Sequence, residues 1–502
     1  MPQSSPETVQ PVNGQSERQR WIVLVVLCAG FLMIILDQTV VNVALPSIQS
    51  DLHFSQSGLA WVVNAYLIAF GGLLLLVGRL GDLIGRRRIF IVGLAVFTSA
   101  SLICGLAHGQ TVLVGARFVQ GIGGAMTSAV ILGMIVTMFP KAAERTKAIG
   151  VYSFVASAGG AVGLLAGGVL TQALNWHWIF FVNLPIGAVT AVYARRLLPK
   201  DQGLGLERGA DIPGAVLLVS ALMLGVYTIV EASRYSWGSA HTLGLGAVAL
   251  GLLGGFVWRQ ASAKSPLISL RVFRSRTVTG ANLIQILMVA GIFGVFFLGA
   301  LYMQRVLHYD AIQVGLAFLP VALGIATMSL GFSARLITRF GGRAVLLPGL
   351  ALLAAGLARF TVAPLHAQYV SDLLPSMVLL GIGAGLSFPA LMTLAMSSAT
   401  AEDAGLVSGL VNTTQQVGGA LGLAVLATLS ATQASSARAD GRTIAQSLTS
   451  GYHVAFATAA GLVIGAIVLA AVLLEPERRS AVNTEAPEAE YDQRPEYLEQ
   501  AA

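Results

Sequence analysis

A single acidic residue, Asp37, lies in the first strongly apolar stretch of the chain, within the run LDQTVVNVALP at residues 36–46. A carboxylate in hydrocarbon costs roughly 2.5–3.5 kcal/mol on insertion scales, so such a group normally faces a watered cavity and has a function. Arg117 is a basic residue inside a later apolar stretch. A guanidinium favours the charged form of a nearby acid, whereas desolvation favours the neutral form. We therefore expect Asp37 to bind a proton and Arg117 to tune that binding.

The two residues should lie at similar depth in the outer half of a membrane. Asp37 is nine residues from Pro46, at the outer end of its span, or roughly 13 Å at 1.5 Å per residue. Arg117 is six residues from Thr111, where its span enters from outside, or roughly 9 Å. The alternative is a fixed ion pair that only holds helices together.

The composition is that of a polytopic membrane protein. Of 502 residues, 55% are hydrophobic and 11% are charged, whereas a soluble domain carries about 25% charge. The formal net charge of +7 is compatible with nucleic-acid binding, but the basic residues form short clusters between apolar segments. We therefore expect a lipid bilayer and no nucleic acid as partner.

Fourteen stretches are long and apolar enough to cross a bilayer, which takes about 20 residues. If the N-terminus is cytoplasmic, most of the 30 Lys and Arg residues fall in cytoplasmic segments, as the positive-inside rule requires. We expect both termini in the cytoplasm and a multi-pass protein of the cell membrane. The predicted spans are residues 21–45, 58–78, 89–107, 111–136, 147–170, 178–198, 212–231, 241–258, 278–302, 312–334, 344–364, 371–396, 405–429 and 452–474.

A short loop sequence recurs in both halves of the chain. Residues 79–87 read RLGDLIGRR and residues 335–343 read RLITRFGGR, which share the frame R-L-x-x-x-x-G-x-R at a separation of 256 residues. Both copies lie in predicted cytoplasmic loops, which favours a duplicated architecture of two bundles around a midplane cavity. Thr338 replaces Asp82 in the second copy.

Six segments in order carry motifs of a known family. They are LDQTVVNVALP (36–46), GRLGDLIGRRR (78–88), LVGARFVQGIGGA (113–125), GGAVGLLAGG (159–168), NWHWIFFVNLPIG (175–187) and GLVSGLVNTTQQVGGALG (405–422). Together they resemble the major facilitator superfamily, specifically its fourteen-helix drug:proton antiporters of the QacA/EmrB type. The likeness extends from about residue 20 to residue 475.

The resemblance implies an all-α integral membrane protein with the major facilitator fold, in which two six-helix bundles flank an inserted two-helix hairpin. It also implies export driven by the proton gradient, with no cofactor, no metal and no obligatory protein partner. The implied organisation is an N-terminal tail (1–20), an N-terminal bundle (21–198), a linker with the hairpin (199–259), a cytoplasmic loop (260–277), a C-terminal bundle (278–474) and a disordered tail (475–502).

The fifth-span motif resembles the family's antiporter motif, with four motif glycines at Gly159, Gly163, Gly167 and Gly168. Leu164 stands where the family usually has proline, which removes a kink and weakens the support for antiport. His177 and Gln415 stand where arginine is usual or common. Close helix packing alone is the alternative role of these glycines.

A substrate cavity should be apolar and aromatic with a few amides, and aromatic faces attract organic cations. For any single candidate the alternative is packing in the core or against lipid. The candidates are Asn64, Tyr66, Tyr152, Phe154, Phe293, Phe296, Phe297, Asn412 and Gln416.

A cytoplasmic gate is expected at the first loop motif, where Gly78, Asp82, Gly85, Arg86 and Arg87 follow the second span. The loop before span 13 carries the acids Glu402 and Asp403 and no basic residue. We expect this acidic loop to dock on the basic one and to latch the outward-facing state. The alternative is a set of topology charges with a solvated helix start.

The favoured function is proton-coupled efflux of lipophilic small molecules, cationic or neutral, by alternating access. One alternative is a dedicated exporter of one endogenous product such as an antibiotic, siderophore or lipid, and another is a non-transporting membrane receptor. The chain has no G-x-x-x-x-G-K-[ST] loop for ATP and no Cys/His cluster with metal spacing, so we do not expect an enzyme.

Overall fold

The computed structural model is helical throughout the part of the chain that it describes. Among those residues α-, 3-10 and π-helices occur and β-strands do not, in agreement with the predicted all-α class. The described residues are 17–139, 141–199, 201, 203, 205, 211–263, 266–268, 270–396 and 404–474.

Thirteen helical stretches among the described residues are long and apolar enough to cross a membrane. The remaining predicted span, the fifth, coincides with α5, in which Val162–Ala173 forms a shorter apolar stretch. The helices are α1 (Glu17–Leu52), α2 (Trp61–Ile84), α3 (Arg86–Gly105), α4 (Gln110–Met138), α5 (Ala142–Ala173), α6 (Trp178–Phe181), α7 (Asn183–Leu197), α8 (Ile212–Tyr235), α9 (Ala240–Ser262), α10 (Arg276–Gly294), α11 (Ala300–Arg305), α12 (Ala311–Ala317), α13 (Leu319–Thr327), α14 (Ala334–Phe340), α15 (Gly342–Phe360), α16 (Leu374–Met396), α17 (Ala404–Ala439) and α18 (Ile444–Leu473).

Several spans are interrupted. The sixth breaks at Val182 between α6 and α7, because Pro185 lacks an N–H and its ring would clash with the carbonyl of Phe181 in a continuous helix. Three spans of the C-terminal half contain π-helical segments, which often mark functional sites. These segments are η4 (Val295–Gly299), η5 (Met328–Ser333) and η6 (Tyr369–Leu373).

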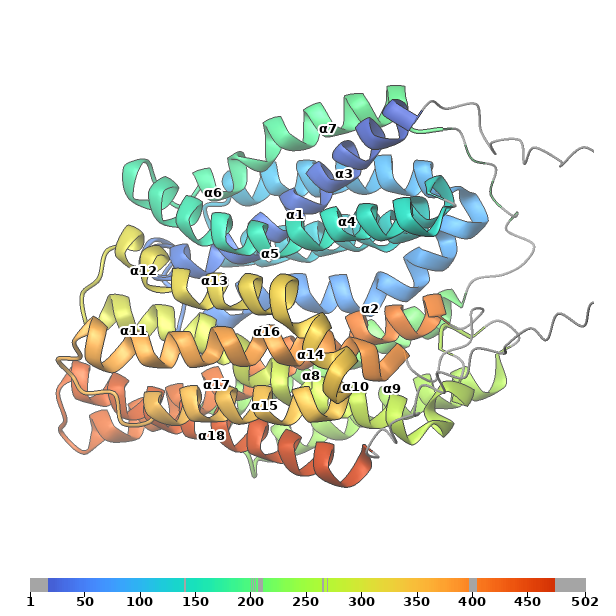
Figure 1. Cartoon of the computed structure of the whole chain (residues 1–502). Helices are drawn as coiled ribbons and strands as arrows, with labels where there is room; N and C mark the ends of the chain where they lie inside the picture. Colours follow the sequence, from blue (N-terminus) through green and yellow to red (C-terminus); the bar gives the residue numbers. More distant parts are fainter. Residues whose placement is uncertain are drawn as a thin grey trace, which may run out of the picture.

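The helices form two bundles that lie one above the other in Figure 1. In the first bundle α1 packs on α5, and α4 packs on both α2 and α3. In the second bundle α15 packs on α16, and α17 packs on both α10 and α18. The two bundles meet where α2 contacts α17 and where α5 contacts α12 and α13.

Hydrogen bonds join the two bundles at one end of the molecule. Gln304 on α11 donates to the carbonyl of Val43 on α1 at 2.8 Å. Gln56, just before α2, donates to the hydroxyl of Ser430 on α17 at 3.2 Å. The two bundles are therefore in direct contact at this end, which the sequence predicts to be the outer one.

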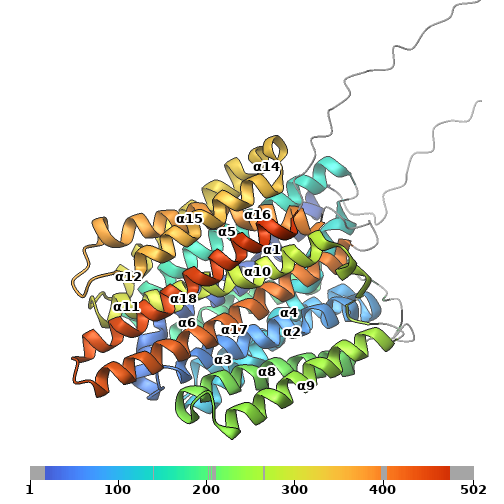
Figure 2. The same cartoon turned by 90° about the horizontal axis from the view of Figure 1, so that it is seen from below.

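The hairpin of α8 and α9 lies at one edge of the molecule, beside α2 and α17 (Figure 2). Its first helix touches both bundles. A Cβ on Gly72 of α2 would meet Val219 at 2.8 Å, and Thr428 of α17 donates to the carbonyl of Ile229 at 3.1 Å. Thus α8 covers the seam between the bundles, while α9 packs mainly on α8.

A buried polar cluster ties the start of α8 to the end of α9. Asp211 accepts hydrogen bonds from Arg259 at 3.0 Å, Gln260 at 2.7 Å and the N–H of Gly214 at 3.0 Å. Burial by itself raises the pKa of the Asp211 carboxyl, but these hydrogen bonds outweigh it and hold the pKa below its ordinary value. Asp211 is therefore ionised at neutral pH and caps α8.

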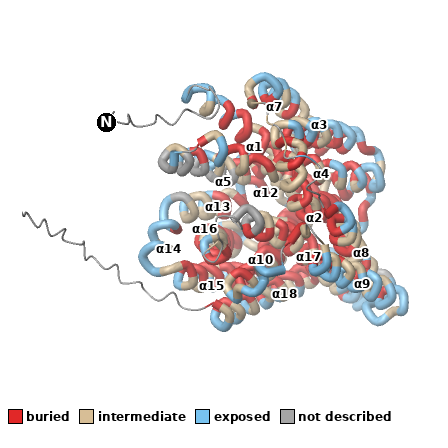
Figure 3. Tube along the Cα trace, turned by 90° about the vertical axis from the view of Figure 1, so that its right-hand side faces the viewer, coloured by how far each residue is buried: buried red, intermediate tan, exposed pale blue. Residues whose placement is uncertain are grey.

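Large apolar side chains are exposed on the outside of the molecule, whereas the interior of each bundle is buried (Figure 3). On α9, Leu250 is 70% and Trp258 is 71% exposed. An apolar surface of this kind around a helical bundle matches contact with lipid rather than with water.

Candidate functional site

The two ionisable residues that the sequence places at similar depth are in contact. Asp37 lies in the middle of α1 and Arg117 near the start of α4. The Nη1 of Arg117 donates to Oδ2 of Asp37 at 2.5 Å. Asp37 is 0% and Arg117 is 1% exposed, so this ion pair is removed from solvent.

Two amides complete the hydrogen bonding of the Asp37 carboxylate. Gln120 on α4 donates to Oδ1 of Asp37 at 2.7 Å, and Asn183 at the start of α7 donates to the same oxygen at 3.0 Å. Both amides also donate to the hydroxyl of Ser101 on α3, at 3.2 Å and 3.0 Å. The carboxylate thus accepts three hydrogen bonds from side chains of α4 and α7.

Arg117 makes further contacts besides its bond to Asp37. Its Nε donates to the carbonyl of Val62 on α2 at 2.9 Å, and its Nη1 also donates to Oε1 of Gln120 at 2.7 Å. Its guanidinium lies 4.4 Å from the ring centre of Tyr66 and 5.8 Å from that of Phe180, which adds cation–π attraction. The cluster therefore draws on α1, α2, α3, α4, α6 and α7, all from the first bundle.

The position of this cluster corrects one expectation. We expected Asp37 and Arg117 to face a watered cavity between the bundles, but both point into the N-terminal bundle and have almost no exposed surface. A buried ion pair costs desolvation and is tolerated only with good geometry and further hydrogen bonds. Here Gln120, Asn183 and the Val62 carbonyl supply those bonds.

The candidate cavity residues do not all line an open space. Tyr66 is 0% exposed beneath Arg117, and Phe297 is 1% exposed in the C-terminal core. Asn64 is also 0% exposed, and its amide N and O have no hydrogen-bond partner. Neighbouring helices cover Asn64, Tyr66 and Phe297 in this conformation, and a cavity-lining role for them stays a prediction.

The other candidates are distributed along the bundle contacts. Tyr152 stacks on Phe31 of α1 with ring centres 4.2 Å apart, whereas Phe154 is 57% exposed. Phe293 lies against Gly419 of α17, and a Cβ on Gly71 of α2 would meet Gln416 at 2.5 Å. Asn412 and Phe296 are half-buried, and Phe296 lines the pocket described next.

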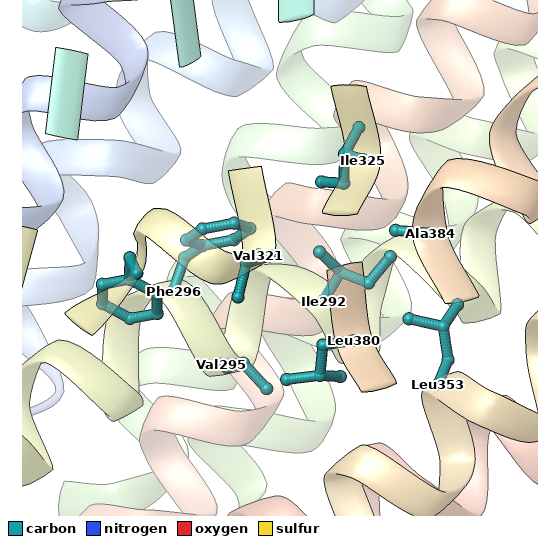
Figure 4. Close-up of a pocket in the computed structure, with 9 residues that line it drawn as sticks. Ile292, Val295, Phe296, Val321, Ile325, Leu353, Leu380 and Ala384 are labelled. Carbon is teal, nitrogen blue, oxygen red and sulfur yellow. The ribbon is translucent and has the colours of Figure 1, made fainter. Parts of the chain in front are cut away.

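An apolar pocket lies inside the C-terminal bundle (Figure 4). The cavity is small, about 10 Å³, its lining residues are apolar, and the ring centres of Phe296 and Phe318 lie 5.3 Å apart. The Phe296 backbone belongs to the π-helical segment η4. The lining residues are Ile292, Val295, Phe296, Phe318, Val321, Ile325, Leu353, Leu380 and Ala384.

The first loop motif makes its contacts within the N-terminal half. Asp82 pairs with Arg86 through Nε at 3.0 Å and Nη2 at 2.9 Å, and Arg86 also donates to the Gly133 carbonyl of α4 at 2.7 Å. Arg87 donates to the Arg195 carbonyl at 2.5 Å. These bonds fix the loop between α2 and α3 to α4 and α7.

An unexpected acid, Asp201, caps the start of α3. Its carboxylate accepts hydrogen bonds from the backbone N–H groups of Arg86 and Arg87. Gly85, whose φ of 113° disfavours a side chain, brings the chain close to this carboxylate. The expected partners Glu402 and Asp403 lie outside the described residues.

The motif glycines of α5 allow close approach on two sides. A Cβ on Gly163 would lie 1.9 Å from the Thr39 hydroxyl of α1, and a Cβ on Gly167 would lie 2.7 Å from the Val40 carbonyl. Gly159 faces α1 in the same way. A Cβ on Gly168 would instead lie 2.6 Å from the Ala311 carbonyl of α12, in the second bundle. In the first loop motif, a Cβ on Gly78 would lie 3.9 Å from its nearest neighbour, so this position is less crowded.

Three members of the polar cluster were not singled out from the sequence. Gln120 and Asn183 lie within the quoted motifs, and Ser101 lies on a third span. No group of three His, Cys, Asp or Glu side chains that could hold a metal ion occurs among the described residues. The Asp37 carboxyl at the centre of this cluster is a group that can bind and release a proton.

Comparison with known proteins supports one family. The sequence profile of the Major Facilitator Superfamily matches residues 27–423. The puromycin resistance protein pur8 of Streptomyces alboniger is 40% identical over 472 residues, which cover 93% of each chain. The cephamycin export protein CmcT of Amycolatopsis lactamdurans is 39% identical, with 90% of this chain and 92% of that one covered.

More distant relatives agree. The multidrug resistance protein Stp of Mycobacterium tuberculosis is 32% identical over 412 residues, covering 82% of this chain and 75% of that one. A bacterial homologue of the human lysosomal transporter Spinster, in an inward-facing and unoccupied conformation, superposes with a TM-score of 0.67. It is 16% identical and the match covers 91% of this chain and 97% of that one, so it shows the fold alone.

Proposed function

The chain belongs to the Major Facilitator Superfamily and is a transporter rather than an enzyme, and from this premise we propose that it exports lipophilic compounds in exchange for protons. The observation that carries this proposal is the buried Asp37–Arg117 pair within a membrane-spanning bundle. A scaffold or receptor gains nothing from an ionisable pair at such depth, because removing charges from water is expensive.

The proposed coupling uses two states of Asp37. In the conformation described here the Asp37 carboxylate accepts hydrogen bonds from three side-chain donors. Protonation would remove the charge that attracts Arg117, and the helices of the first bundle would then be free to separate. Because the carboxylate has no exposed surface here, we infer that protons reach it in a different conformation. Export would follow if substrate binding and protonation exclude one another.

The substrate class follows from where buried charge lies. Among the described residues the buried charged side chains are Asp37, Arg117 and Asp211, and none belongs to the second bundle. Because Arg117 neutralises Asp37, the bundles combine little net buried charge with many apolar and aromatic side chains. Such surroundings suit a lipophilic monovalent cation or a neutral amphiphile and give no basis for binding dications.

A second candidate function, export of one endogenous antibiotic, is favoured by a specific observation. Two relatives of about 40% identity over nine-tenths of the chain, pur8 and CmcT, are each named for a single antibiotic. The relative named for multidrug resistance is 32% identical. Export of a single product would use the same ion pair and the same bundles.

The protein is a multi-span membrane transporter, and we propose that both termini are cytoplasmic. On that side the loop of Asp82, Arg86 and Arg87 is held to α4 and α7. We propose that docking of Glu402 and Asp403 on this basic loop latches the outward-facing state. Reversing the charge of both acids should slow transport, and unchanged rates would count against the latch.

The proposal is tested in proteoliposomes with a panel of fluorescent lipophilic cations, neutral antibiotics and dications, with and without an imposed pH gradient. We expect gradient-driven movement of several lipophilic compounds and none of the dications. Movement of a single compound would support the dedicated exporter. Transport that ignores the pH gradient in the wild type would refute proton coupling, and an Asp37→Asn variant that still releases protons when substrate is added would exclude Asp37 as the proton site.

A further inference from the structure

The side-chain oxygen of Asn183 has a feature that the ion pair does not explain. Its side chain is 0% exposed, and its Nδ2 donates to both Asp37 and Ser101, but its Oδ1 has no hydrogen-bond partner. A buried acceptor without a partner is normally avoided, because it loses its bonds to water without replacement. Such an atom, next to the proposed proton site, indicates a state of the site in which it is used.

The neutral form of Asp37 needs an acceptor that its charged form does not. An ionised carboxylate only accepts hydrogen bonds, whereas a carboxyl group also donates one through its O–H. Arg117 has no acceptor at all. The Oε1 of Gln120 already accepts from Arg117 at 2.7 Å and from the Cys104 thiol at 3.6 Å. Oδ1 of Asn183 is the acceptor in the described cluster that is still available.

The other titratable groups around Asp37 do not supply this acceptor. Tyr66 on α2 lies under the guanidinium of Arg117, and its hydroxyl accepts from Gln38 at 3.4 Å. Cys104 on α3 is directed at Gln120. Arg117 on α4 completes this set, so none of these three titratable groups offers Asp37 an unpartnered acceptor oxygen.

We propose that Asn183 is a positioning residue that serves both charge states of Asp37 by rotating its side-chain amide. With Asp37 ionised, Nδ2 donates to Oδ1 of the carboxylate, as observed. When a proton from water binds Asp37, a half-turn about the Cβ–Cγ bond of Asn183 places its own Oδ1 opposite the new O–H. No covalent bond forms or breaks apart from the one that takes up the proton.

The surroundings of Asn183 suit this rotation. The terminal torsion of an asparagine side chain has two broad, roughly equivalent orientations. The hydroxyl of Ser101 now accepts from Asn183 and donates to the Phe180 carbonyl at 2.9 Å. Since a hydroxyl both donates and accepts, it can turn its single O–H from the Phe180 carbonyl to Oδ1 of the rotated amide. Asn183 is the first residue of α7, just after the break between α6 and α7, so it does not lie within one continuous helix.

This inference rests on the proposed proton coupling, and the test separates the two. Substrate transport is measured in proteoliposomes in two modes, with the compound that the wild type transports best: net transport driven by a pH gradient, and exchange of labelled for unlabelled substrate at equal pH. Net transport requires Asp37 to gain and lose a proton in each cycle, whereas exchange does not. If the wild type shows no gradient-driven transport, the proposed function fails irrespective of Asn183.

The variant is Asn183→Leu, which has a similar size and no hydrogen-bonding group. We expect the rate of gradient-driven transport to fall about tenfold, because one buried polar group is left unpaired. The rate of exchange should stay within about twofold of the wild-type rate. Asn183→Ala gives the same readout without excess volume if the leucine variant does not fold. Asn42→Leu on α1 is the matched control, because Asn42 donates only to the Gln38 carbonyl of its own helix, and both modes should persist.

Two results overturn the inference while leaving proton coupling intact. If both Asn183 variants keep wild-type gradient-driven transport, the amide is not needed for protonation of Asp37. If both variants lose the two modes equally, Asn183 has a structural role only, since a defect in proton uptake alone would spare exchange.

Discussion

Removing the buried ion pair one partner at a time, and then completely, separates its structural role from its proposed coupling role. The single variants are Asp37→Leu and Arg117→Leu, and the third variant carries both. Each single change leaves one charge buried at 0–1% exposure. Breaking a buried pair in this way typically costs about 3–5 kcal/mol, whereas replacing both partners with apolar residues is often neutral.

The structure refines those magnitudes. In Arg117→Leu the carboxylate keeps two donors, Gln120 and Asn183, but the Val62 carbonyl loses its partner. In Asp37→Leu the guanidinium keeps its hydrogen bonds to the Val62 carbonyl and to Oε1 of Gln120. The amides of Gln120 and Asn183 each lose an acceptor. Because each single variant keeps part of its hydrogen bonding, we expect losses near 3 kcal/mol, and a loss in the double variant that is smaller than their sum by at least 2 kcal/mol.

The assay is reversible unfolding in mixed micelles, together with gradient-driven transport in proteoliposomes. We expect the double variant to approach wild-type stability and to show no proton-driven transport. A double variant that is stable and still coupled to the pH gradient would show that the pair only holds helices together. Single variants that each lose less than about 1 kcal/mol would contradict the view that the pair is desolvated, since exposed pairs contribute that little.

Three further predictions concern the motif glycines, the linker and the hairpin. Gly168→Val should force α5 away from the Ala311 carbonyl of α12 and raise labelling of a Gln304→Cys reporter by an impermeant maleimide several-fold. Gly160→Val is its control, since that position has open space, and equal labelling in both would refute the contact. Asp201→Ala should lower the free energy of unfolding by about 0.5–2 kcal/mol, because the cap of α3 is lost. Asp201→Asn should retain most of the wild-type stability, and equal losses in the two variants, measured by unfolding, would exclude capping. Because the pKa of Asp211 is lowered in the folded state, its stabilising effect is present above its unfolded pKa of about 3.9 and is lost as the pH falls through the folded pKa. Asp211→Asn should therefore be less stable than the wild type at neutral pH and no different at the acidic end of the unfolding series, and a difference that persists there would refute the assignment.

The depth of the ion pair could be predicted from the sequence, but its direction could not. Helix rise and span orientation place Asp37 and Arg117 at similar depth, and the structure brings them within 2.5 Å. However, α1 is apolar on all sides, and its buried residues are spread around the helix. No polar face therefore indicates that Asp37 points into its own bundle rather than towards the seam.

The missing members of the cluster lie at a depth similar to that of Arg117, but depth alone does not single them out. Gln120 is one turn from Arg117 on the same face of α4. Ser101 and Asn183 lie about as far from the outer ends of their predicted spans as Arg117 does from its own. Polar residues such as serine are too common in apolar spans for depth alone to single them out. Asp201 gives no signal at all, because a linker that folds back over a helix start depends on tertiary contacts.

The two halves of the chain, related by the repeated loop motif, differ most at their centres. The pocket of the second bundle lies among α10, α13, α15 and α16, in the first four spans of that half. The ion pair occupies the first four spans of the other half. At the repeat separation of 256 residues, Asp37 corresponds to Phe293 and Arg117 to Leu373. An apolar centre thus stands where the first bundle holds two charges.

This asymmetry limits how protons and substrate can influence one another. If the proton binds only in the first bundle, the second bundle responds to it only through contacts that cross the seam. One such contact lies close to Asp37: the Val43 carbonyl, nearly two turns along α1, accepts a hydrogen bond from Gln304 at 2.8 Å. A shift of α1 on protonation would therefore act first on the contact between α1 and α11. In the proposed topology this contact lies on the outer side, where the proposed antiporter would have to open to release its substrate.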